Sequence, residues 1–275
     1  MVLNEYARTG TDMGNHRMPG PLCSLNQQET WDDDIPGLTG MSHAGPLCAH
    51  ALYSRIASAG SVHAAQHANL ESLFHACLNP GRGLSENDYR DAAKALGVEV
   101  AAIQAVAEVE TSGAAFDEDG RPRILFERHY FHRLTGGRHA TKHARISNKH
   151  GGGYGKFSCQ YPKLEEAFRL DPDAALRSAS WGRFQIMGDN FRAAGFDCVC
   201  DFVLAHVRAE SGHLTAFVNF VSSHKGMAHA LATKHWADFA RAYNGKGYKL
   251  NDYDNKMAKA YAHLTKPAVP TKPGH

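Results

Sequence analysis

The chain lacks long apolar runs and has no strong excess of charge of either sign. No stretch of 18 apolar residues occurs, which excludes a transmembrane helix. The first 20 residues are polar and contain no apolar signal region, so we expect synthesis in the cytosol without a secretory signal peptide. A net charge of +2 with a pI near 8.2 is too mild to indicate nucleic-acid binding. We therefore expect neither nucleic acid nor membrane insertion.

Metal-binding signatures are also missing. Cys198 and Cys200 form a C-x-C pair without a second pair at zinc-finger spacing, so we expect the six cysteines to be free thiols. His63 and His67 stand four residues apart with no carboxylate beside them, and no His-Glu-x-x-His motif occurs. We expect no metal and no cofactor. A histidine-rich metal protein is an alternative that no motif supports.

The composition is that of a folded globular protein. The chain is 43% hydrophobic and 21% charged, and its 275 residues can bury a sizeable core. Its 18 histidines add positive charge as the pH falls, which suits an anionic polymer as binding partner.

Breaker residues divide the chain into three parts. Residues 1 to about 45 are irregular in pattern, whereas 49–78 show helical periodicity. The cluster Asn79-Pro80-Gly81-Arg82-Gly83 marks the expected boundary between an N-terminal segment (1–80) and a folded domain (84–264). The tail 265–275 contains three prolines, so we expect it to be flexible.

The domain begins with two expected helices. Ser85, followed three residues later by Asp88, is typical of a capped helix start, and Gly97 is typical of a helix end. The second helix is expected from about Val98 to Glu110.

Further elements follow downstream. An Asp-Gly turn precedes an expected short strand at 124–126, and 132–162 are expected to form a long loop or a small β-region. Asp171 and Pro172 indicate a helix start, and Asp189 is expected to cap another helix. The remaining expected helices cover 197–210, 213–223, 235–243 and 252–264.

Glu110 is the main candidate for chemistry. Ile103, Val106 and Ala107 lie seven, four and three positions before it, which places Glu110 on the apolar face of its helix. It also stands in the last turn, where the helix dipole disfavours negative charge. Both effects raise the pKa of a carboxyl group, as the acid of a glycosidase requires. Glu108 falls off this face and is expected to be an ordinary surface acid.

Three motifs occur in a characteristic order. They are Glu-Thr-Ser-Gly at 110–113, Ser-Trp-Gly-Arg-Phe-Gln-Ile-Met at 180–187 and Ala-Tyr-Asn-Gly at 242–245. This succession resembles goose-type lysozymes and lytic transglycosylases. Together with Ile-Leu-Phe-Glu-Arg-His at 124–129, Gly-Gly-Tyr-Gly at 152–155 and Ser-Ala-Ser-Trp-Gly at 178–182, it resembles the N-acetylmuramidase family of phage endolysins over about 84–264.

The resemblance implies a fold and an activity. The fold would be α+β and mostly helical, a lysozyme-like domain with a cleft between a helical lobe and a small β-region. Glu110 would protonate the glycosidic oxygen between N-acetylmuramic acid and N-acetylglucosamine in peptidoglycan strands, by the two-carboxylate chemistry known from lysozyme. Residues 1–80 do not resemble the peptidoglycan-binding module that often precedes this domain.

The second carboxylate is expected to be Glu127, on the strand after the turn. There it would act as base for water or stabilise the cationic transition state. The alternative is an ion pair with Arg128 or Arg123. Asp117 and Asp119 are the other candidates for this second carboxylate, although aspartates at these positions are more typical of turn-forming residues.

Four further residues are expected in the site. Tyr243 would hydrogen-bond the Glu110 carboxyl group, and Asn244 would lie in the cleft. Gln185 and Ser180 would bind acetamido or hydroxyl groups of the sugar. Core packing is expected for the two large aromatic residues of the same motif, Trp181 and Phe184.

The alternatives are a lytic transglycosylase, which forms 1,6-anhydro-muramic products, and a non-catalytic sugar-binding module. The protein would act in the periplasm or cell wall of a bacterium. A phage lysin and an effector injected by a secretion system both fit. The missing wall-binding module favours the effector, which would have an immunity protein or a secretion carrier as a partner of residues 1–80.

Overall fold

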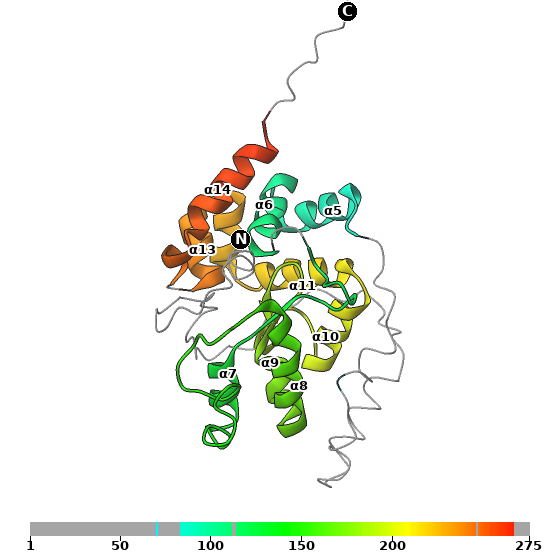
Figure 1. The fold of residues 1–275 in the computed structure, drawn as a ribbon. Coiled ribbons are helices and arrows are strands. Elements are labelled where there is room, and N and C mark those ends of the chain that lie inside the picture. Colours follow the sequence, from blue (N-terminus) through cyan, green and yellow to red (C-terminus); the bar gives the residue numbers. More distant parts are fainter. Residues whose placement is uncertain (1–69, 71–82, 112–113, 246, 267–275) are drawn as a thin grey trace, which may run out of the picture.

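The computed structural model describes residues 70, 83–111, 114–245 and 247–266. These residues form a mostly helical α+β fold with one small sheet, as expected (Figure 1). The helical pattern at 49–78, apart from Leu70, the irregular segment 1–45, and His63 and His67 lie outside the described residues. Leu70 is 3% exposed and belongs to the hydrophobic core.

The first two helices of the domain are α5 (Glu86–Leu96) and α6 (Val100–Thr111). The capping box is present, because the Ser85 hydroxyl accepts from the Asp88 amide and the Asp88 carboxylate accepts from the Ser85 amide at 2.7 Å. Gly97 ends α5 in the left-handed conformation, φ 65°, which glycine adopts without steric cost. Both expected helices are confirmed.

Three short antiparallel strands form the sheet in the order β1-β2-β3. They are β1 (Ile124–Phe126), β2 (Ala179–Trp181) and β3 (Ile186–Met187), and all their residues are buried. Ser180 pairs with Leu125 on one side and with Met187 on the other. The strand at 124–126 is confirmed, and the motif at 180–187 supplies the other two strands and the turn between them.

The expected loop at 132–162 is shorter than predicted. Helix α7 (Arg128–Leu134) covers its first residues, and the 3-10 turn η1 (Phe157–Cys159) and helix α8 (Gln160–Leu170) cover its last. The segment between consists of turns and irregular backbone. Its anchoring contacts, described below, come from side chains outside the loop, so sequence periodicity did not indicate them.

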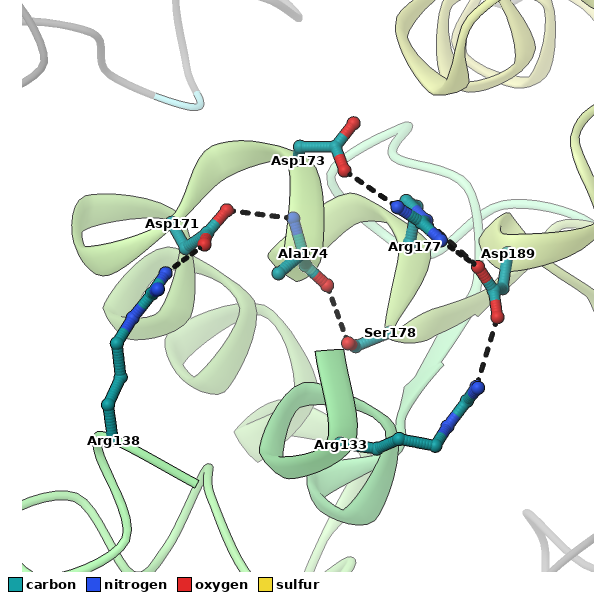
Figure 2. Close-up of polar contacts among 8 residues, drawn as sticks. All are labelled: Arg133, Arg138, Asp171, Asp173, Ala174, Arg177, Ser178 and Asp189. Atoms are coloured by element: carbon teal, nitrogen blue, oxygen red, sulfur yellow. Dashed lines mark hydrogen bonds and ion pairs between the residues drawn. The ribbon is translucent and has the colours of Figure 1, made fainter. Parts of the chain in front are cut away.

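Helix α9 (Pro172–Arg177) begins as expected, because the Asp171 carboxylate accepts from the Ala174 amide at 3.0 Å (Figure 2). The cap predicted at Asp189 is wrong. Asp189 lies inside the 3-10 turn η2 (Gly188–Asn190), and its carboxylate pairs with Arg177 at 2.7 Å and Arg133 at 3.0 Å. Figure 2 shows these two arginines approaching Asp189 from α9 and α7. Long-range pairing of this kind is not visible in local sequence.

The C-terminal part is a succession of helices. They are α10 (Val199–Arg208), α11 (Glu210–Ser222), α12 (Lys225–Ala232), α13 (Trp236–Asn244) and α14 (Tyr253–Leu264), with the 3-10 turn η3 (Tyr248–Asn251) before the last. Four of them match the expected ranges. The sequence analysis missed α12, a short helix in which three apolar side chains, Met227, Ala230 and Leu231, are buried.

Helix α6 packs between α5 and α14 at one end of the molecule. Figure 1 shows α5, α6, α13 and α14 at one end of the molecule and α7, α8 and α9 at the other, with α10 and α11 between them. Helix α6 packs closely against α14, and α13 packs against both α12 and α14. Among the described residues, every helix is too short or too polar to cross a bilayer.

Candidate active site

Glu110 lies on the buried face of α6, one residue before the helix ends. Ile103 and Val106 on the same face are fully buried, and Glu110 itself is 9% exposed. Glu108 is exposed, as expected for the opposite face. The expected placement of Glu110 among apolar side chains is therefore confirmed.

This environment changes the acidity of Glu110. Burial raises its pKa to about 7, because a charged carboxylate is poorly solvated there. A hydrogen bond from the Asn244 side chain and the charge of Lys256 act in the opposite direction and lower it. The C-terminal end of a helix also disfavours negative charge. Near neutral pH, Glu110 is thus divided between its protonated and ionised forms and can donate a proton.

Asn244, at the end of α13, is the residue that contacts Glu110. Its Nδ2 donates to Glu110 Oε1 at 3.2 Å, and Asn244 is 4% exposed. The Tyr243 hydroxyl donates to the Phe184 carbonyl oxygen at 2.7 Å, and its expected hydrogen bond with the Glu110 carboxyl group stays a prediction. Asn244 contacts the acid, and Tyr243 joins α13 to the turn between β2 and β3.

That turn is stabilised by its own polar side chains. Ser180 Oγ donates to Gln185 Oε1 at 2.8 Å, and Gln185 Nε2 donates to the carbonyls of Gly182 at 2.8 Å and Arg123 at 3.2 Å. Gln185 has a φ of 49°, in the left-handed region that costs a non-glycine residue energy. Both N–H donors of the Gln185 amide are bonded within the protein, whereas Gln185 Oε1 and the Ser180 hydroxyl oxygen keep acceptor capacity.

Trp181 and Phe184 of the same motif are fully buried, as expected for core residues. The Trp181 indole Nε1 donates to the Leu176 carbonyl at 3.1 Å, and the Phe184 ring stacks on Phe217 with centroids 4.3 Å apart. The aromatic residues of the motif therefore attach the turn to the core.

Two buried histidines that the sequence analysis did not single out support the turn from behind. The rings of His206 and His213 stack with centroids 4.7 Å apart. His213 Nδ1 accepts from the Arg183 amide at 3.0 Å, and its Nε2 donates to the His206 carbonyl at 2.7 Å. Gly182 lies against both rings, and a Cβ there would be 2.6 Å from His213 Nδ1. The only signal in the sequence was the spacing of seven residues between them, which would place both on one face of a single helix. In the structure, His206 lies in α10 and His213 in α11.

Glu127 lies directly after β1, at the N-cap position of α7, and is 2% exposed. The Tyr154 hydroxyl lies 3.1 and 3.0 Å from its two carboxylate oxygens and donates to them. His129 Nδ1 lies 3.1 Å from Glu127 Oε2, without hydrogen-bond geometry. The alternative of an ion pair with Arg128 or Arg123 is wrong. Sequence analysis did not assign roles to Tyr154 or His129, although both stand inside the quoted motifs.

The loop that carries Tyr154 is held by side chains from two helices, α7 and α8. Arg128 donates to the carbonyls of His150 and Gly151, each at 3.0 Å. Lys163 Nζ donates to the carbonyls of Gly153 and Tyr154, and burial lowers the Lys163 pKa to about 8.

Gln160 completes this anchoring from α8. Its Nε2 donates to the Tyr154 carbonyl at 2.8 Å, and its Oε1 accepts from the Phe126 amide at 3.0 Å. One side chain thereby ties the loop to the end of β1, beside Glu127.

The alternative candidates for the second carboxylate are Asp117 and Asp119. Both make hydrogen bonds or ion pairs within the turn that precedes β1. Asp117 accepts from the amides of Asp119 and Arg121 at 3.0 and 2.8 Å. The Arg121 guanidinium pairs with both carboxylates, at 2.9 and 2.7 Å. Their expected turn-forming role is confirmed.

The three described cysteines, Cys159, Cys198 and Cys200, are free thiols, and Cys23, Cys48 and Cys77 lie outside the described residues. Burial raises the pKa of the Cys198 thiol, so this cysteine is not activated as a nucleophile.

Comparison with known proteins assigns this arrangement to a family. The model of the N-acetylmuramidase family matches residues 99–265. The chain belongs to the N-acetylmuramidase family. It is also similar to the crystal structure of the Burkholderia AP3 phage endolysin, with 34% identity and a TM-score of 0.62. That match covers 80% of this chain and 95% of the endolysin. A search of curated proteins found no match.

The region that matches the N-acetylmuramidase family contains every candidate residue. Glu110, Glu127 and the turn at 180–187 all lie between 99 and 265, as do Tyr243 and Asn244. Within this muramidase domain, the motifs that are distant in sequence meet through side-chain hydrogen bonds. Asn244 contacts Glu110, and Tyr243 contacts the turn.

Proposed function

We propose that this muramidase-family protein hydrolyses the β-1,4 bond between N-acetylmuramic acid and N-acetylglucosamine, with Glu110 as the general acid. The observation that carries the proposal is the burial of Glu110, which raises its pKa to about 7. A glycosidase acid must hold its proton at working pH and release it to the leaving oxygen. Asn244 holds the Glu110 carboxyl group in position by its hydrogen bond to Oε1.

For Glu127 we propose electrostatic stabilisation of the cationic transition state. A general base must reach a water molecule, and Glu127 is 2% exposed beneath the Tyr154 hydroxyl. A fixed negative charge needs no such access, and it acts more strongly in a medium of low dielectric. The bonds made by Asp117 and Asp119 within their turn support Glu127 over either of them.

The four other candidate residues divide into two proposed roles. Asn244 orients Glu110, and Tyr243 keeps α13 against the turn through Phe184. Ser180 binds a sugar hydroxyl or acetamido group through its free acceptor capacity. Gln185 donates to the sugar by exchanging one of its internal hydrogen bonds, since both of its N–H donors are already bonded.

The bond cleaved is tested by mass spectrometry of digests of purified peptidoglycan. Hydrolysis of the proposed bond yields reducing muramic acid ends. Products with 1,6-anhydro-muramic acid would instead identify a lytic transglycosylase, and reducing N-acetylglucosamine ends a glucosaminidase. The variant Glu110→Gln is the control, and if neither protein released ends, the sugar-binding module would be the better description.

We propose that the protein acts on the cell wall as a phage endolysin, in the periplasm or wall of the host. Its similarity to the AP3 phage endolysin supports this setting over that of a secreted effector. For an effector, residues 1–80 would bind a secretion carrier or an immunity protein. Purified protein added to a panel of candidate small periplasmic proteins tests this: a stable complex that inhibits lysis would identify an effector and contradict the endolysin setting.

A further inference from the structure

Residues 128–164 contain no aspartate or glutamate. This stretch carries eight lysine and arginine residues and five histidines, although the whole chain has a net charge of only +2. It runs from α7 through the irregular loops to α8, at the end of the molecule opposite α14 (Figure 1). So one end of the fold concentrates positive charge, while the rest of the chain is net acidic.

Carboxylates from neighbouring segments neutralise three exposed arginines of this stretch. Arg133 pairs with Asp189 at 3.0 Å, and Arg138 pairs with Asp171 (Figure 2). Arg145 pairs with Glu166 at 2.6 Å. The charges of these arginines are therefore balanced by carboxylates of the protein itself.

Four other cationic residues of the stretch are not paired with a carboxylate among the described residues. Lys142, Lys149 and Lys156 are exposed, and none of the ion pairs found in the described part of the chain includes them. Arg128 donates to backbone carbonyls only, so its charge is not neutralised by a carboxylate. We call these four residues the basic rim.

Arg128, Lys149 and Lys156 of the basic rim lie on segments that adjoin the proposed site. Arg128 follows Glu127 directly, and it binds the loop whose Tyr154 hydroxyl donates to Glu127. Lys149 and Lys156 flank that same loop. An anionic group bound at the rim would therefore lie beside the sugar chain that the site receives.

We propose that the basic rim binds the carboxylates of the stem peptides of peptidoglycan. Every muramic acid carries such a peptide, so negative charges recur next to each bond of the proposed type. Clustered surface cations attract a polyanion over about 10 Å at moderate salt and speed its association. The inference rests on the proposed function for its substrate and adds the part of that substrate which this surface recognises.

The test uses full-length protein with Glu110→Gln, so that binding is measured without cleavage. The triple variant K142Q/K149Q/K156Q removes rim charge. Its matched control, K94Q/K225Q/K259Q, removes three exposed lysines elsewhere, so both variants change net charge equally. Circular dichroism and melting temperature verify that each variant is folded. Binding to intact sacculi, to glycan strands stripped of peptides, and to anionic phospholipid vesicles is measured in about 0.1 M and about 1 M salt.

We expect the rim variant to bind intact sacculi on the order of tenfold more weakly at low salt, with the difference largely lost at high salt. Its preference for intact sacculi over stripped strands should fall, whereas the control variant should keep that preference. Equal loss in both triple variants would show an effect of net charge alone and overturn the proposal. Equal loss on stripped strands, or rim-dependent binding to vesicles but not sacculi, would overturn the choice of partner.

Failure of the proposed function is distinguished by the protein with Glu110 intact. If it releases no reducing muramic ends from sacculi, the activity is wrong whatever the rim binds. If it does release them and the rim variant binds like its parent, only the rim proposal is wrong.

Discussion

The Asn244 side chain donates to Glu110 Oε1 at 3.2 Å and so joins the ends of α13 and α6. The donor stabilises the ionised form of Glu110, while burial stabilises the protonated form. The pKa of about 7 is the balance of these two effects. Helices far apart in the chain thus set the acidity of one carboxyl group.

Replacing Glu110 with glutamine should leave the fold intact and remove nearly all activity on purified peptidoglycan. The amide has similar size but no acidic proton, and loss of a general acid costs on the order of a hundredfold or more. Release of reducing ends measures the rate, and the melting temperature checks the fold. Retention of half the activity would rule out Glu110 as the acid.

Activity should fall as the pH rises through about 7, because Glu110 must be protonated to donate. Asn244→Ala removes a donor to the carboxylate, which raises the Glu110 pKa and moves this alkaline limb to higher pH. The pH profile of kcat/KM measures the shift. Tyr243→Phe is the matched control, since the Tyr243 hydroxyl donates to the Phe184 carbonyl. In this variant the pH at which activity falls should not change. A shift in Tyr243→Phe but not in Asn244→Ala would reverse the two roles.

Gly182→Ala should destabilise the fold more than Gly136→Ala. Both glycines have positive φ, 69° and 60°, so alanine costs about 1–2 kcal/mol at either position. At Gly182 the new Cβ also meets the His206 and His213 rings at 2.8 and 2.6 Å, which adds about 1–3 kcal/mol of overpacking. At Gly136 it meets nothing within 4 Å. Urea denaturation measures the free energy of unfolding of both variants. An equal loss in the two would show that the histidine rings move aside without an energetic cost.

The protein should lose stability as the pH falls below 6.5. Burial lowers the pKa of His206 to about 4 and that of His213 well below its usual value. Below 6.5 the unfolded chain therefore binds protons that the folded chain excludes, and the loss continues down to about pH 4. His206→Gln should make the dependence of the unfolding free energy on pH shallower, whereas His229→Gln at an exposed site should not. An unchanged slope in His206→Gln would contradict this account.

The sequence predicted the elements whose signals are local. The capping box at Ser85, the helix start at Asp171 and the buried position of Glu110 all follow from residues within one or two turns. The α+β class and the family came from motifs in their order. Prediction was weaker where a side chain chooses its partner by packing, as at Asp189, which pairs with arginines instead of capping a helix.

The same limit applies to the candidate site. Sequence placed Tyr243 and Asn244 near Glu110 but did not indicate that Asn244 donates to it, because that contact depends on where α13 lies relative to α6. Likewise, the partner of Glu127 lies 27 residues along the chain, at Tyr154, in a loop without periodicity. His206 and His213 were missed since their stacking joins two helices.

The glycine-rich loop at 150–155 is organised like a cation-binding loop whose cations belong to the chain. Its backbone carbonyls at His150, Gly151, Gly153 and Tyr154 converge on the side chains of Arg128 and Lys163. A covalently attached cation cannot be removed by a chelator or diluted away. The cations that hold this loop are therefore part of the chain, and the amide of Gln160 adds a neutral donor to one of the same carbonyls, that of Tyr154.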